Sequence, residues 1–100
     1  MKRARSGWGG VILVCGKCSK KIGGGFGPKG IDRLAKALRA APGLGKGRKA
    51  AVGVIETKCL GLCPKKAVTF VDTRRPGEWL VVAPGEDVAA LAAQFSRDSA

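Results

Sequence analysis

The four cysteines of this chain fall into two closely spaced pairs, and this spacing constrains the fold more than any other feature. Cys15 and Cys18 are separated by two residues and Cys59 and Cys63 by three, with 40 residues between the pairs. Each pair directly follows a predicted strand. If these strands are parallel neighbours, both pairs leave the sheet at the same edge, and their loops can converge on one site.

The chain contains no histidine, which narrows the chemistry that its cysteines can serve. Without an imidazole there is no Ser–His or Cys–His catalysis and no histidine metal ligand, so we expect a protein that is not an enzyme. Four thiolates can hold a tetrahedral zinc ion, a 2Fe–2S cluster or a 4Fe–4S cluster. Zinc ribbons usually separate their pairs by about 15–20 residues, so the longer separation here favours a cluster.

The hydrophobic pattern predicts an α/β domain with a mixed sheet of about four strands and two main helices. Predicted strands span residues 11–14, 50–57, 67–72 and 78–83, and predicted helices span 31–41 and 88–95. We expect the first two strands to form a parallel pair and the last two an antiparallel hairpin. A glycine-rich loop is expected from the first cysteine pair to Gly30, and a basic linker from Gly43 to Lys49.

The length of 100 residues suits one domain. We divide the chain into a basic N-terminal arm (1–10), a folded domain (11–95) and a C-terminal tail (96–100). The apolar run at 11–14 is shorter than the roughly 7–15 residues of a signal-peptide core, and no run approaches the roughly 20 residues of a membrane span. We therefore expect a cytoplasmic protein without membrane contact. In that compartment spaced cysteines more often bind metal than form disulfides.

The net charge of +12 lies in the first half of the chain. Residues 1–50 carry 13 Lys and Arg against Asp32 alone, whereas residues 51–100 carry six residues of each sign. The strongly basic first half of the chain suits an acidic partner. Lysines beside both cysteine pairs could dock an acidic redox protein or could form an ordinary solvated surface. Nucleic acid is a weaker expectation: Trp8 adjoins basic residues, but the sequence contains no recognisable reader module. An edge strand could support a homodimer.

Two segments carry a family resemblance. The first reads Cys59-Leu60-Gly61-Leu62-Cys63-Pro64-Lys65-Lys66-Ala67-Val68, and the second reads Pro84-Gly85-Glu86-Asp87-Val88-Ala89-Ala90-Leu91. Both resemble thioredoxin-like 2Fe–2S ferredoxins, the family that includes the small electron-transfer subunit of respiratory complex I. The resemblance covers about residues 11–95. It implies a thioredoxin-like fold and electron transfer through a 2Fe–2S cluster held by Cys15, Cys18, Cys59 and Cys63. Cys18 departs from the pattern, because family members usually place more residues between the first two ligands.

Two other interpretations of the cysteines stay open. A structural zinc ion held by the same four thiolates would make the chain a basic interaction module for nucleic acid or an acidic protein. A thioredoxin-type redox pair at Cys15 and Cys18 would normally open a helix whose N-terminus lowers a thiol pKa. The predicted loop after Cys18 disfavours this redox pair. The redox-pair interpretation also gives no role to Cys59 and Cys63.

Overall fold

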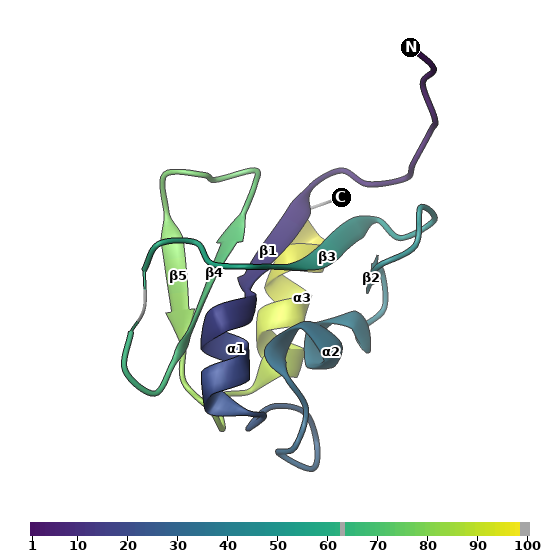
Figure 1. Ribbon diagram of the computed structural model, residues 1–100. Helices are drawn as coiled ribbons and strands as arrows, with labels where there is room; N and C mark the ends of the chain where they lie inside the picture. The colour runs from purple at the N-terminus through teal and green to yellow at the C-terminus, as the bar shows by residue number, and fades with distance from the viewer. Residues whose placement is uncertain (63, 99–100) are drawn as a thin grey trace.

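The computed structural model describes residues 1–62 and 64–98, and in them the chain folds as an α/β domain (Figure 1). Five strands form one mixed sheet, and three helices accompany it. The strands are β1 (Val11–Cys15), β2 (Leu44–Gly45), β3 (Val52–Thr57), β4 (Val68–Asp72) and β5 (Trp79–Val82). The helices are α1 (Gly16–Ile22), α2 (Leu34–Arg39) and α3 (Val88–Asp98).

The strand order is β2-β3-β1-β4-β5, with β1 at the centre. β1 pairs in parallel with β3, so that Cys15 lies opposite Thr57, the last residue of β3. On its other side β1 pairs antiparallel with β4, which forms a hairpin with β5. The expected parallel pair and hairpin are therefore confirmed. Because β1 and β3 end level with each other, the segments that carry the two cysteine pairs leave the same edge of the sheet.

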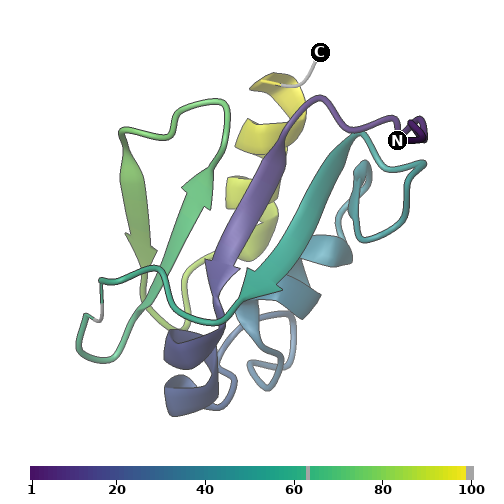
Figure 2. The same cartoon turned by 45° about the horizontal axis from the view of Figure 1, so that its top comes forward.

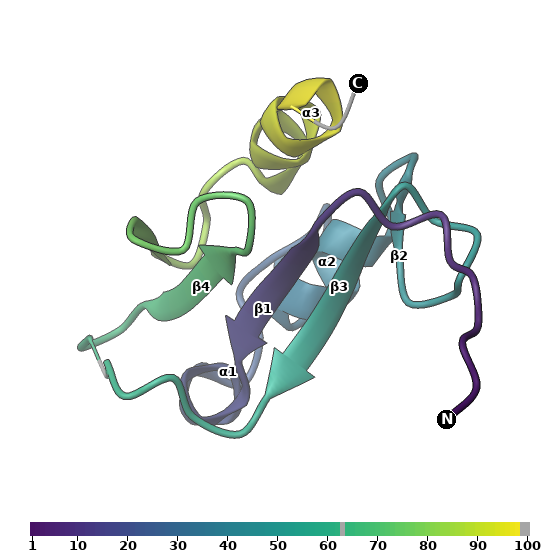
Figure 3. The ribbon, with the colours of Figure 1, turned by 90° about the horizontal axis from the view of Figure 1, so that it is seen from above.

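The core lies between the sheet and helices α2 and α3, which cover the same face (Figures 2 and 3). Ile12 and Val14 alternate along β1 and are fully buried, as are Val52 and Val54 on β3. This period-two burial is what a strand with one covered face requires. The buried side chains that the helices contribute are Leu34, Ala35, Ala37, Leu38, Val88, Ala92 and Phe95. The ring of Phe95 meets that of Phe70 edge to face, with 5.7 Å between centroids.

The predicted glycine-rich loop after the first cysteine pair is wrong in its first part, because residues 16–22 form α1. One local bond and one tertiary contact hold this short helix. The Ser19 hydroxyl donates to the carbonyl of Cys15, the N-cap residue, at 2.9 Å, and the Lys17 N–H donates to the distant Lys58 carbonyl at 2.8 Å. The helix ends at Gly23, whose φ of 77° places it in the left-handed region that glycine tolerates best. Its N–H returns to the Ser19 carbonyl.

The larger differences from the prediction concern the start of the second helix, the linker and the tail. The second helix begins at Leu34 instead of residue 31, because Asp32 forms a two-bond antiparallel bridge with Phe26. The expected linker contains the short strand β2, where Leu44 is buried and pairs with Val52, and this adds a fifth strand. The predicted tail at 96–100 is helical through Asp98, and residues 99–100 lie outside the described residues. No helix in the described ranges is long and apolar enough to cross a membrane.

Candidate metal centre

Cys15 lies at the junction of β1 and α1, fully buried. Burial by itself raises the pKa of the Cys15 thiol. Hydrogen bonds from the N–H groups of Cys18 and Leu60, from the Cys18 thiol and from the Lys17 N–H outweigh that effect, so the pKa lies below its ordinary value. The position therefore favours a thiolate, the form that binds metal.

Cys18 lies in the first turn of α1 and is also buried, with 4% of its surface exposed. Its thiol donates to the carbonyl oxygen of Leu62 at 3.7 Å. The same oxygen accepts a hydrogen bond from the hydroxyl of Thr69 on β4 at 3.2 Å. Two elements of the domain, α1 and β4, thus hold the segment that follows β3 against the first cysteine pair.

Residues 58–62, which follow β3, form a loop over the edge of the sheet. The Lys58 carbonyl binds α1, the Leu60 N–H reaches Cys15 and the Leu62 carbonyl reaches Cys18. We call this segment the covering loop. Its contacts join two parts of the chain that lie some 40 residues apart in sequence.

Cys59 lies in the covering loop with an exposed side chain. The N–H of Gly61 donates to its sulfur at 3.3 Å. Gly61 has a φ of 98°, a conformation that glycine adopts at little cost and other residues rarely adopt. The tight turn at Gly61 therefore directs a backbone donor at the third predicted ligand.

The structure brings two of the four predicted ligands together and leaves a third nearby. Cys15 and Cys18 lie side by side, and Cys59 belongs to the loop that contacts them without joining them. Cys63 lies outside the described residues. Within residues 1–62 and 64–98, no group of three or more His, Cys, Asp or Glu side chains is gathered to hold a metal ion.

The donors at this edge fit thiolate ligation of zinc or of an iron–sulfur cluster. Cys15 combines a lowered pKa with several N–H groups directed at its sulfur, and Cys59 receives another N–H. Such donors stabilise negative charge on sulfur and tune iron–sulfur centres. A Cβ built at Gly61 would meet nothing within 4 Å, so there is space beside that turn. These features do not discriminate zinc from iron.

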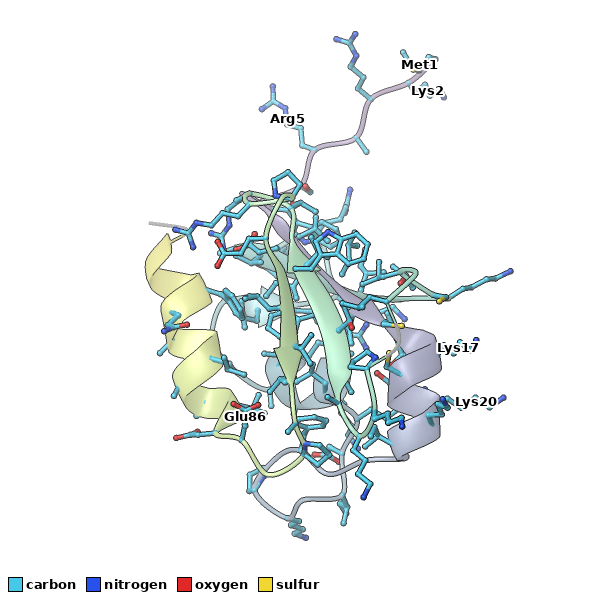
Figure 4. All side chains as sticks on the ribbon, turned by 90° about the vertical axis from the view of Figure 1, so that its left-hand side faces the viewer. Met1, Lys2, Arg5, Lys17, Lys20 and Glu86 are labelled. Carbon is cyan, nitrogen blue, oxygen red and sulfur yellow. The ribbon has the colours of Figure 1, made fainter. Side chains whose placement is uncertain are left out.

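A cavity of about 300 Å³ adjoins Cys18. Four cationic side chains line it, and the described residues of its lining are Lys17, Cys18, Lys21, Ile22, Pro64, Lys65, Lys66 and Ala67. Figure 4 shows Lys17 and its neighbour Lys20 projecting outward from α1. Lys66 has a φ of 53°, which is uncommon for a residue with a side chain. We call the four lysines the cavity lysines.

The sequence analysis missed two features of this edge, α1 and the cavity beside it. A signal for α1 was present: Lys20 and Lys21 precede Gly23, and cations in a last turn followed by glycine are typical of a helix C-terminus. The cavity had no such signal, because the two stretches that line it meet only in the folded chain. Another cavity, of about 820 Å³, lies between α2 and α3, and none of the described residues that line it is a cysteine.

Comparisons of the chain with protein-family models, with curated proteins and with solved structures found no match.

Proposed function

We propose that this chain is a thioredoxin-like 2Fe–2S ferredoxin, a small electron carrier whose cluster is held by Cys15, Cys18, Cys59 and Cys63. The order of elements supports the proposal, since a strand–helix–strand unit is followed by a hairpin and a closing helix. Its sheet has the parallel and antiparallel pairings that the hydrophobic pattern predicts.

The observation that carries the proposal is the contact of the covering loop with the first cysteine pair. Two of its backbone groups, the Leu60 N–H and the Leu62 carbonyl, reach Cys15 and Cys18. Cys59 directly precedes Leu60 in sequence, so a movement of the covering loop would bring its sulfur toward the pair. An arrangement with the two bends at opposite ends of the molecule would have excluded a shared centre.

When bound, the cluster supplies one-electron redox chemistry at the surface. The chain's own residues do the rest. Cys15 and Cys18 are buried and keep water from their sulfurs, and backbone N–H groups stabilise negative charge there. The proposal places the protein in a reducing compartment such as the cytoplasm, because thiols that are oxidised to disulfides cannot ligate a metal.

The cavity lysines are the surface on which we propose that an acidic redox partner docks. All four cations surround the opening beside Cys18, and none of the described residues that line it is acidic. Charge complementarity of this kind steers association and depends on salt. In this proposal the chain transforms no substrate itself and passes electrons to the docked protein. A homodimer through the edge strand β5, where Trp79 and Val81 are exposed, is compatible with docking at the cysteine edge.

The experiment is an analysis of iron, sulfide and zinc in anaerobically purified protein, with its visible spectrum and its electron paramagnetic resonance spectrum after reduction. We expect two irons and two sulfides per chain, brown protein, and a one-electron signal on reduction. Cys59→Ser and Cys63→Ser should each lower the iron content, whereas Ser6→Ala, in the N-terminal arm, should leave it unchanged. Zinc without iron would contradict the proposal and favour the zinc-stabilised interaction module.

A second candidate is a thiol–disulfide redox pair at Cys15 and Cys18, and a specific observation favours it. The sequence argument against this pair was the expected loop, but α1 begins directly after Cys15, and the Cys15 pKa is lowered. The test is titration of metal-free protein with glutathione buffers. A reversible Cys15–Cys18 disulfide in protein that also never acquires iron would favour this candidate over the ferredoxin.

A further inference from the structure

A second basic groove lies along the lateral edge of the sheet that β3 forms, whereas the cysteine pairs lie at the end of the strands. β2 pairs with only the first two residues of β3, so the rest of that edge is not covered by a strand. The guanidinium of Arg39 donates to the exposed edge at the Val54 carbonyl, 3.0 Å away. A groove of about 510 Å³ follows this edge, lined by Trp8, Arg33, Ala35, Lys36, Arg39, Lys46, Ile55 and Glu56.

Trp8 is held in this groove by two contacts of its side chain and by hydrogen bonds of the residues on either side of it. Its ring lies on the backbone of Gly53, where a built Cβ would stand 2.6 Å from three ring atoms. Its indole N–H donates to the Gly47 carbonyl at 2.8 Å. The neighbouring Gly7 and Gly9 N–H groups donate to Arg48 and Ala51 at 2.6 and 2.7 Å. The ring is thus supported on one side by the sheet, and it lines the groove.

The charge of the groove is strongly positive. Four cations line it against Glu56 alone, which pairs with Arg33 at 3.0 Å. Lys36 has a longer contact, 3.6 Å, with Asp32. The N-terminal arm, which leads to Trp8, carries further cations and extends away from the body with Lys2 and Arg5 (Figure 4). The turn that accepts the Trp8 hydrogen bond adds exposed Arg48 and Lys49.

We propose that this groove binds single-stranded nucleic acid, a function beyond electron transfer. Cations along a groove neutralise successive phosphates, and an aromatic ring provides a stacking platform for a base. Acidic protein chains match the charge equally well, but only nucleic acid presents a flat aromatic base beside every phosphate. The aromatic ring within the cationic groove therefore selects nucleic acid over an acidic peptide.

Gly53 supplies an independent argument for a built site. Glycine weakens the interior of a strand, because it packs no side chain and loses more conformational freedom on folding. Here its bare backbone lets the Trp8 ring lie directly on the sheet. A side chain at residue 53 would occupy the space that the ring fills. The position of Trp8 in the groove thus depends on the absence of a side chain at Gly53.

The test measures binding of fluorescein-labelled ten-nucleotide uridine and thymidine oligomers to the purified full chain by anisotropy, from 50 to 300 mM salt. We expect the logarithm of the affinity to fall with the logarithm of salt with a slope of about −3, from about −0.7 per phosphate contact. Lys36→Ala/Lys46→Ala should weaken binding and reduce that slope by about 1.4. The matched double variant Lys20→Ala/Lys29→Ala removes two exposed lysines outside the groove. Its changes in affinity and in salt slope should be no more than about half of those in Lys36→Ala/Lys46→Ala.

Trp8 separates stacking from charge. Trp8→Ala should weaken binding by at least about fivefold. Trp8→Phe keeps an aromatic ring, controls for structural damage in Trp8→Ala, and should restore most of the lost affinity. The matched variant Trp79→Ala should bind as the parent does. Polyaspartate of equal charge serves as the competitor. The proposal is overturned if polyaspartate competes as well as the oligomers do, or if Trp8→Ala binds normally, or if the two lysine double variants are equivalent.

Discussion

The thiol of Cys18 lies 3.7 Å from the carbonyl oxygen of Leu62, 44 residues further along the chain. This contact joins the first turn of α1 to the covering loop. The hydroxyl of Thr69 donates to the same oxygen at 3.2 Å. If Cys18 ligates a metal, its thiol proton is lost and Thr69 remains as the donor to Leu62. In the metal-free protein both donors bind the Leu62 carbonyl, whereas in the metal-loaded protein this contact depends on Thr69.

Thr69→Val is the first prediction. The substitution preserves shape but removes the hydroxyl of a fully buried residue, leaving the Leu62 carbonyl without that donor. We expect unfolding free energy to fall by about 1 kcal/mol and iron to be released to a chelator several times faster. Urea denaturation and the rate of chelator-induced bleaching measure the two effects.

The matched control is Thr57→Val. Thr57 donates a similar hydrogen bond, to the Val14 carbonyl at 3.3 Å, but within the β1–β3 pair and not to the covering loop. Its stability should fall by a similar amount while iron release is unchanged. Equal iron release from both variants would show that the hydroxyl of Thr69 has no special part in retaining metal.

The acid stability of the domain provides the second prediction. Burial raises the pKa of Asp72, but the side chain and the N–H of Arg74 outweigh it, so the pKa lies below its usual value. A lowered folded pKa stabilises the protein above the unfolded pKa of about 3.9, and this contribution is lost as pH falls through the folded value. Asp72→Asn should cost about 1.5–3 kcal/mol at pH 7 and progressively less below about pH 4.

Urea denaturation of both proteins from pH 7 to pH 2.5 measures this difference. The paired control is Glu78→Gln, an exposed residue in the β4–β5 turn whose removal should leave the pH profile parallel to that of the parent. A constant difference between Asp72→Asn and the parent down to pH 2.5 would contradict a lowered Asp72 pKa.

The sheet could be predicted from the sequence because its strands are encoded locally. The run Val11 to Val14 is β-branched and apolar, and a buried central strand needs such a run. The turn at 73–77 between two apolar stretches likewise encodes the hairpin. α1 could not be predicted by the same means, because its lysines and glycine give no apolar period. The bond from its Lys17 N–H to the Lys58 carbonyl ties it to a segment some 40 residues further along, which the local pattern does not reveal.

The candidate site was predicted in part. The position of the pairs after parallel strands was sufficient to place Cys15, Cys18 and the loop of Cys59 at one edge. The detailed arrangement was not predictable, because the loop is held by the backbone groups of Leu60 and Leu62, which any residue carries. Whether four thiolates share one centre stays a prediction.

Gly53→Ala is the third prediction and concerns the seat of Trp8. An added Cβ would lie 2.6 Å from the indole ring, too close for the ring to stay where it is. We expect a loss of about 1–3 kcal/mol in unfolding free energy and a red shift of Trp8 emission, measured in a Trp79→Phe background. Gly77→Ala, where a Cβ would meet nothing within 4 Å, is the control and should show neither change. Unchanged emission in Gly53→Ala would mean that the ring does not rest on this strand.

The cavity lysines provide the last prediction. A four-thiolate 2Fe–2S centre gains negative charge on reduction, so nearby cations favour the reduced form. One charge at about 8 Å and an effective dielectric near 20 contributes roughly 2 kcal/mol, on the order of 90 mV for one electron, and solvent screening reduces this for exposed side chains. Lys17→Gln and Lys65→Gln should each lower the reduction potential by about 10–40 mV at low salt, and by less at 0.5 M salt.

The control is Lys46→Gln, in the groove along β3, which should leave the potential within about 5 mV of the parent. Spectroelectrochemical titration measures all three, and equal shifts for Lys46 and Lys17 would show that these lysines act only through the net charge of the protein.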